Sequence, residues 1–334
     1  MNFSRCVKEW EQLRVLESPI MSKRYLEELD GGHDVMNSFA LSAYISQARH
    51  FFESARDSAS VIKPLLLYYG MIQFVKAYIL VRLPNRAMRA ESQKHGLAIP
   101  RRKHPLPYWK QIIWTQPNGV FVEWLRATGA LATEAAHAHF ANKQPMPIGD
   151  LWSCLPEAVP LLPALGLTAR CTRTAIYGAQ ETNRSLSMQV ARSWPANCGL
   201  TIEECEKRIA SQLPDQCLVH FDWLSEQHEL TKLDKSNPSP LLLAHHPLLC
   251  LPRVSGQWLM ISPLPLPLLE EVSLPEPMIH FALLFQLSMM LRYEGEAWAE
   301  LLGDGHTIEA ILVERLCDLV EETTPAYFAD ALHI

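Results

Sequence analysis

The chain has 334 residues, which is long enough for two modest domains or for one large domain with an elaboration. Its hydrophobic fraction of 48% and charged fraction of 20% are ordinary for a globular protein and exclude disorder over most of the length. The net charge of −6 is uneven, because residues 82–103 carry +6 and the remainder carries −12.

The N-terminal part is predicted to be helical. Apolar residues at helical spacing predict a short helix over 7–16 and a longer one over 38–56. A third helix, over 64–83, begins at a proline, is apolar on nearly every side and ends before Pro84. We expect the two longer helices to pack as an antiparallel pair with Gly70 at a close approach. The residues expected at their contact are Ala48, Phe51, Leu67 and Phe74.

A β-hairpin is predicted near residues 110–124. Asn118-Gly119 lies between two runs rich in β-formers, which is a strong local signal for a hairpin turn. Helical stretches over 131–141 and 148–155 are expected to follow.

The later part mixes short strands with helices. Prolines cluster near residue 160, so we expect a helical unit over 1–160 and a mixed unit over 161–334. The fold class is therefore α+β, mainly α-helical, with a small sheet and C-terminal helices. The expected strands are 167–177, 186–193, 217–223, 248–252 and 257–262, and the expected helices are 201–213, 277–293 and 308–320.

The sequence indicates a soluble, cytoplasmic protein. The first ten residues carry charges and no apolar run, so we expect no secretory signal. The apolar stretch 278–291 is shorter than the roughly 20 residues of a membrane span, which favours a buried helix and no membrane association. Arg292, at its end, is expected to pair with an acid such as Glu294 or Glu296.

Eight cysteines are scattered without CxxC spacing, which favours reduced thiols. No metal-ligand pattern, phosphate loop or dinucleotide motif occurs, so we expect no metal and no cofactor.

Four short segments resemble the YaaC-like proteins of bacteria, in an order that covers most of the chain. This family has no settled activity, so the resemblance implies no particular reaction. The segments are Trp10-(x)2-Leu13, the run Ile62–Met71 (IKPLLLYYGM), His95-Gly96-Leu97, and Arg292-Tyr293-(x)4-Trp298.

The N-terminal unit is also similar to HEPN domains. It has a helix with small inward residues, an apolar helix ending in Lys76-Ala77, and then a basic loop with His-Gly-Leu. Many HEPN domains are metal-independent ribonucleases or toxins, with an Arg followed four to six residues later by a His. Arg89 and His95 fit with five residues between them, so the resemblance implies a catalytic role for this pair. The chain departs from the pattern at Ala90, which replaces a polar residue, and no strong helical pattern begins at His95.

Arg89 and His95 are residue types that can cleave RNA without a metal. A neutral His can accept the 2′-hydroxyl proton, and an Arg can stabilise the charge of the phosphate. The basic loop, residues 82–104, would attract phosphates, or it would dock on an acidic protein surface. Its nucleic-acid-binding candidates are Arg82, Arg86, Lys94, Arg101, Arg102 and Lys103.

The function that these patterns favour is binding of nucleic acid, with RNA as the partner, or of a protein, within a toxin or phage-defence system. One alternative is a metal-independent endoribonuclease that uses Arg89 and His95. The other is a structural subunit that contacts a protein partner or a second copy and binds no nucleic acid.

Overall fold

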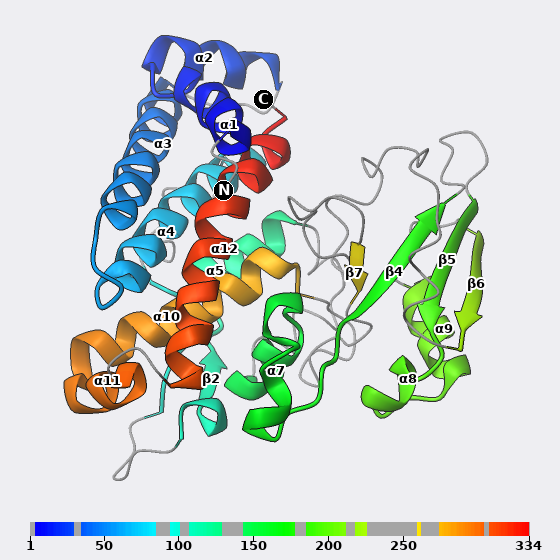
Figure 1. The fold of residues 1–334 in the computed structure, drawn as a ribbon. Helices are drawn as coiled ribbons and strands as arrows, with labels where there is room; N and C mark the ends of the chain where they lie inside the picture. The colour runs from blue at the N-terminus through cyan, green and yellow to red at the C-terminus, as the bar shows by residue number, and fades with distance from the viewer. Residues whose placement is uncertain are drawn as a thin grey trace. The chain divides into compact units, whose positions relative to one another are not determined.

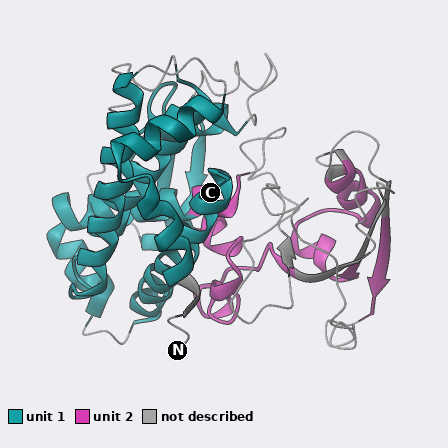
Figure 2. Ribbon diagram, turned by 90° about the horizontal axis from the view of Figure 1, so that it is seen from above, with its two compact units in different colours: residues 1–148, 280–334 teal, residues 149–279 magenta. Residues whose placement is uncertain are grey.

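The computed structural model describes residues 4–29, 35–84, 94–100, 107–128, 143–177, 185–211, 218–225, 259–261, 274–303 and 307–333. The chain forms two compact units (Figure 2). The first comprises residues 1–148 and 280–334, and the second comprises residues 149–279. The mainly helical α+β class is confirmed. The expected division into a helical unit over 1–160 and a mixed unit over 161–334 stays a prediction.

The first unit is built from helices around a buried centre (Figure 1). Helices α3 and α4 run antiparallel, because Tyr44 faces Lys76 while Phe51 faces Tyr69. Helix α12 packs on α4, where the rings of Phe74 and Phe328 stack with centroids 5.0 Å apart. The helices are α1 (Ser4–Val15), α2 (Pro19–Glu28), α3 (Val35–Arg56), α4 (Lys63–Arg82), α5 (Val120–Ala127), most of α10 (Glu276–Tyr293), α11 (Gly295–Leu302) and α12 (Ile308–Ala331).

The predicted contact between α3 and α4 is confirmed. Ala48, Leu67 and Phe74 are fully buried, while Phe51 is half-buried. Phe52, its neighbour in the chain, takes the central position against Trp10 and Phe74. Apolar burial along this face stabilises the pair by roughly 25 cal/mol per Å² of surface removed from water.

Helix α10 is a core helix, as its apolar stretch predicts. Every residue from Met278 to Ser288 is buried, including the polar side chains of His280 and Gln286. Among the described helices, α4 has the length and composition to cross a membrane, yet 67% of its most apolar window is buried inside the protein. Such burial is typical of the central helix of a soluble fold.

The predicted hairpin near 110–124 is wrong in its second half. Strand β2 (Ile112–Thr115) pairs antiparallel with β1 (Leu97–Ala98) and β3 (Pro145–Pro147), whereas Val120–Ala127 forms α5. Val120 through Leu125 are all buried. Because a strand with one wet face would bury only alternate residues, the tertiary environment favours a helix against α4 over the local turn signal.

The second unit contains the four-stranded sheet and confirms most of the expected elements. Its strands lie in the order β6-β5-β4-β7, with β5 and β6 parallel and the other pairs antiparallel. The expected segments 131–141 and 248–252 lie outside the described residues. The elements are α7 (Ile148–Ser153), β4 (Thr172–Tyr177), β5 (Ser185–Ala191), α8 (Trp194–Asn197), α9 (Ile202–Ser211), β6 (Leu218–Leu224) and β7 (Leu259–Ile261).

Replacing Gly70 by Ala should destabilise the protein, although Ala is the better helix former by about 1 kcal/mol. A Cβ at Gly70 would lie 2.6 Å from Cδ2 of Phe52, which is 98% buried and locked between other rings. We expect the free energy of unfolding to fall by about 1–3 kcal/mol, measured by urea denaturation.

Gly295→Ala is the matched control, because a Cβ at that helical glycine meets nothing within 4 Å. It should leave stability unchanged or slightly raised. If the Gly70→Ala protein is as stable as the wild type, the Phe52 ring can move aside at no cost in free energy, and the prediction is wrong.

Candidate functional site

His95 is the predicted catalytic residue that the described structure places. Of the basic candidates, Arg82 and Lys94 are described, and both are exposed. Arg86, Arg89, Arg101, Arg102 and Lys103 lie outside the described residues, so the pairing of Arg89 with His95 stays a prediction.

The backbone around His95 is held by the start of α5. The carbonyl of Lys94 accepts a hydrogen bond from Val120 N (2.8 Å), and the carbonyl of His95 accepts one from Phe121 N (3.1 Å). The first N–H groups of a helix have no partner within it, so these carbonyls satisfy donors that would otherwise be unpaired.

Two glycines make this close approach possible. Gly96 and Gly119 have φ values of 79° and 125°, in the region that side chains disfavour. A Cβ on Gly119 would lie only 2.4 Å from the backbone nitrogen of Gly96. The crossing therefore fixes the position of the His95 backbone.

The His95 side chain is held by Tyr68. The Tyr68 hydroxyl and His95 Nδ1 share a hydrogen bond of 2.7 Å, and the imidazole also lies beside the ring of Phe285. Burial lowers the pKa of His95 below its ordinary value of 6.5, and the nearby charges of Arg292 and Lys76 lower it further. The imidazole is therefore neutral at pH 7. Among the described residues, its Nε2 has no hydrogen-bond partner.

Arg292 lies among tyrosines. Its Nη1 donates to the Tyr69 hydroxyl (3.2 Å) and its Nε donates to the Ser288 carbonyl (3.0 Å). The guanidinium carbon lies 5.3 Å from the centre of the Tyr293 ring and 6.0 Å from that of Tyr69. The expected ion pair is wrong for the described chain, because no described carboxylate lies within 4.0 Å of this group.

Lys76 continues the same face along α3 and α4. Its Nζ lies 5.9 Å from the centre of the Tyr44 ring, and burial lowers its pKa. Tyr69 stacks on Phe51 one step further along, with ring centroids 5.7 Å apart. Residues seven apart on a helix share a face, so these side chains form one continuous stripe. The stripe consists of Tyr44, Phe51, Tyr69 and Lys76, and Arg292 and His95 lie at its Tyr69 end. We call these six residues the aromatic–cation face.

The two cations of this face differ from the other half-buried cations of the described chain. Arg49 pairs with Glu17 and Glu53, and Lys63 pairs with Asp318 and Glu321. Likewise, Arg126 pairs with Glu123 and Arg170 with Asp150. Lys76 and Arg292 have aromatic rings and hydroxyls around them in place of a described carboxylate. Such cations favour an external anion, because desolvation is costly without a counter-charge.

Sequence reasoning found His95 but missed its partners. It singled out neither Tyr68 nor Tyr69 as a site residue, and it expected Arg292 to pair with an acid. The usable signal was the family resemblance itself, because three of its four segments contribute to this site: the run Ile62–Met71 gives Tyr68 and Tyr69, the His-Gly-Leu segment gives His95, and the late segment gives Arg292. Within the described residues, no group of three or more His, Cys, Asp or Glu suits a metal ion.

Comparison with known proteins identifies the family. The sequence model of the YaaC-like protein family matches residues 8–332, so the chain belongs to this family. No curated protein and no solved structure matches the chain.

His95 should make the stability of the protein depend on pH. In the unfolded chain the imidazole takes up a proton near pH 6.5, whereas in the folded protein its lowered pKa delays protonation. Its contribution is therefore complete above about pH 6.5 and is lost as the pH falls through the folded pKa. We expect the loss of unfolding free energy between pH 7.5 and pH 5.5 to be smaller in His95→Asn, measured by urea denaturation.

Asn is chosen because its amide keeps a polar atom near the Tyr68 hydroxyl but does not titrate. Identical losses in the wild type and His95→Asn would contradict the assignment of a lowered pKa to His95.

Proposed function

We propose that this YaaC-like protein binds single-stranded RNA in the cytoplasm through its aromatic–cation face. The observation that carries this proposal is that Lys76 and Arg292 are half-buried without a described carboxylate partner. The positive charges of both residues also lower the pKa of His95. A phosphate is the anion that best fits two separated cations beside a neutral hydrogen-bonding ring.

The aromatic residues support RNA over a small anion. Tyr293 is 69% exposed beside Arg292, and Tyr69 is half-buried on the other side of the guanidinium. Proteins that bind single strands combine cations along the backbone with aromatic rings on which bases stack. The seven residue steps from Tyr44 to Phe51 span about 10 Å along α3, which is more than a single phosphate occupies.

Two exposed cations of the basic loop add positive charge to this unit. Lys94 precedes His95 directly, and Arg82 ends α4, the helix that carries Lys76. Both are exposed and available to phosphates. The predicted contribution of the remaining loop cations, and a role in a toxin or phage-defence system, rest on the sequence and the family resemblances alone.

RNA cleavage is the second candidate, favoured by the lowered pKa of His95 next to Arg292. A neutral imidazole can take the 2′-hydroxyl proton while a guanidinium neutralises charge on the phosphate. The 2′-oxygen then bonds to phosphorus and the bond to the 5′-oxygen breaks. The products are a 2′,3′-cyclic phosphate and a 5′-hydroxyl, which receives the proton. Arg89 stays the predicted partner of His95 in this reaction, and Arg292 is the cation that the described structure offers.

Binding should depend on Arg292 and on salt. For a 20-nucleotide uridine RNA in filter binding, we expect Arg292→Gln to weaken affinity about tenfold and to reduce the log–log salt slope by about 0.7. Lys76→Gln should act in the same direction. The control is Lys23→Gln, which removes an exposed cation on α2 that pairs with Glu27.

Folding of each variant is checked by its thermal melting curve. A folded wild type that retains no RNA at low salt would contradict the proposal, as would an equal loss of affinity in Lys23→Gln.

Cleavage is tested separately, by incubating the protein with the same RNA in EDTA. If His95 is the base, His95→Asn should abolish the cyclic-phosphate product and still bind RNA. Product formed equally by wild type and variant would exclude His95 from catalysis, and RNA bound without cleavage would leave the binding function alone.

A further inference from the structure

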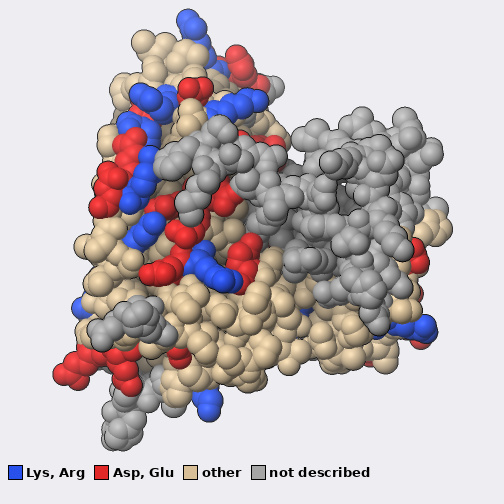
Figure 3. All heavy atoms as spheres, viewed as in Figure 1, with Lys and Arg blue, Asp and Glu red and all other residues tan. Residues whose placement is uncertain are grey.

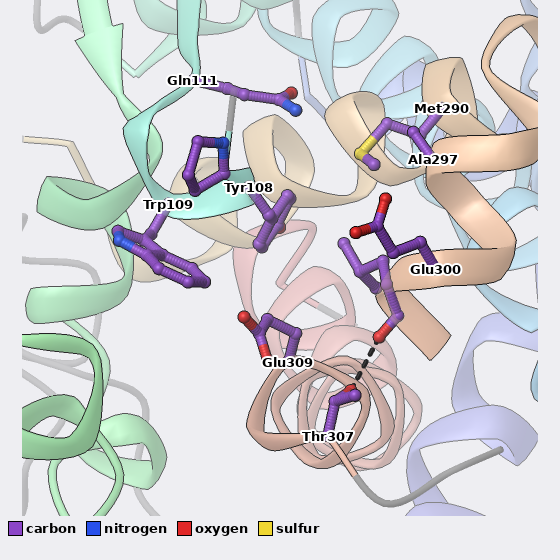
Figure 4. A pocket seen from close by; sticks show the side chains of 10 residues that line it. Tyr108, Trp109, Gln111, Met290, Ala297, Glu300, Thr307 and Glu309 are labelled. Atoms are coloured by element: carbon purple, nitrogen blue, oxygen red, sulfur yellow. Dashed lines mark hydrogen bonds between the residues drawn. The ribbon is translucent and has the colours of Figure 1, made fainter. Parts of the chain in front are cut away.

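A hollow lies in the first unit, lined by none of the residues of the aromatic–cation face. It has a volume of about 500 Å³ and lies between the end of α10, α11, the first turn of α12 and the short 3-10 helix η2 (Tyr108–Lys110) (Figure 4). Its lining includes Tyr108, Trp109, Gln111, Met290, Glu300 and Glu309.

Two carboxylates reach this hollow from different helices. Glu300 lies on α11 and Glu309 lies in the first turn of α12, and Figure 4 shows their carboxylates on two sides of the Tyr108 ring. The intervening turn is fixed by Thr307, whose hydroxyl donates to the Leu301 carbonyl (2.7 Å) and accepts from Ala310 N (3.0 Å). Neither carboxylate has a described cation within 4.0 Å.

The wall of the hollow formed by α11 and the start of α12 is acidic, while η2 carries the cation Lys110. Residues 294–314 include six acids and no Lys or Arg. Figure 3 shows acidic side chains gathered over α11, in the lower left of the view. The negative electrostatic potential of these acids attracts cations and repels nucleic acid, so the hollow differs in chemistry from the aromatic–cation face.

The rest of the lining is mainly aromatic and apolar, and Gln111 adds a polar side chain. Tyr108 is 95% buried and Trp109 is half-buried, and Met290 supplies an apolar contact. Gln111, which is 93% buried, is held by a hydrogen bond from the side chain of Gln286 on α10. Aromatic faces attract ammonium groups, and apolar walls match methylene groups.

We propose that this hollow binds an aliphatic diamine or polyamine. One ammonium group would pair with Glu300 and another with Glu309, while the methylene chain between them lies against Tyr108, Trp109 and Met290. A bare metal ion fits less well, because the two carboxylates come from different helices and do not converge on one point (Figure 4).

The test is isothermal titration calorimetry of the full chain with 1,4-diaminobutane and with spermidine, without RNA. We expect both amines to bind, and 1,4-butanediol, which has the same carbon chain without charge, to give no heat. Glu300→Gln or Glu309→Gln should weaken binding about threefold or more, and the double variant about tenfold or more. Because the sites carry opposite charge, neither change should weaken RNA binding.

Glu296→Gln is the matched control, since it removes an exposed acid of the same helix that does not line the hollow. Trp109→Leu should weaken binding while its melting temperature confirms folding. No heat from either amine at millimolar concentration would overturn the proposal. So would an equal loss in Glu296→Gln, which would indicate attraction to the acidic surface without a defined site.

Discussion

The first turn of α5 needs hydrogen-bond acceptors from outside the helix, and the carbonyls of Lys94 and His95 supply them. This single crossing is possible because Gly96 and Gly119 have no side chains to separate the two backbones. It places His95 over α4, within reach of the Tyr68 hydroxyl, and it starts β1 beside β2. The site is thus a consequence of how one buried helix satisfies its first N–H groups.

Charge is separated within this unit. Lys76 and Arg292 lie among tyrosines without described carboxylates, while residues 294–314, from the end of α10 into α12, carry six acids and no Lys or Arg. Had Arg292 paired with the nearby Glu294 or Glu296, its charge on the aromatic–cation face would have been neutralised. Instead its side chain turns to Tyr69 on α4. The positive aromatic–cation face and the acidic surface of α11 therefore each remain able to attract a ligand of opposite charge. A net charge of −6 for the whole chain conceals both surfaces.

The elements that could be predicted from the sequence were those that show a periodic or nearly continuous pattern of apolar residues. The apolar repeat of α3 and the nearly uniform apolarity of α4 and α10 require burial in any fold, and Gly70 marked a close contact between α3 and α4. The hairpin prediction failed because an Asn-Gly turn signal is worth less than burying the whole of α5. The site itself depends on pairs far apart in sequence. Tyr68 bonds to a residue 27 positions away and Tyr69 to one 223 positions away, and no spacing rule encodes such contacts.

The hydrogen bond between Tyr68 and His95 favours the first proposed function, RNA binding, over the second, RNA cleavage. Tyr68 is fully buried, and burial raises its pKa, so its hydroxyl keeps its proton. Among the described residues, His95 Nδ1 is the only hydrogen-bond partner of that hydroxyl. Leaving a buried O–H without an acceptor costs about 1–3 kcal/mol, so the arrangement in which Tyr68 donates to Nδ1 is favoured.

In that arrangement His95 carries its own proton on Nε2, the nitrogen without a described partner. Nε2–H is a donor suited to a phosphate oxygen, in keeping with the nearby charges of Arg292 and Lys76. General-base catalysis needs the opposite tautomer, in which Nδ1–H donates to Tyr68 and the phenol finds another acceptor. The resting tautomer of His95 is therefore the one that suits the proposed binding of a phosphate, and the proposed cleavage would require the other tautomer.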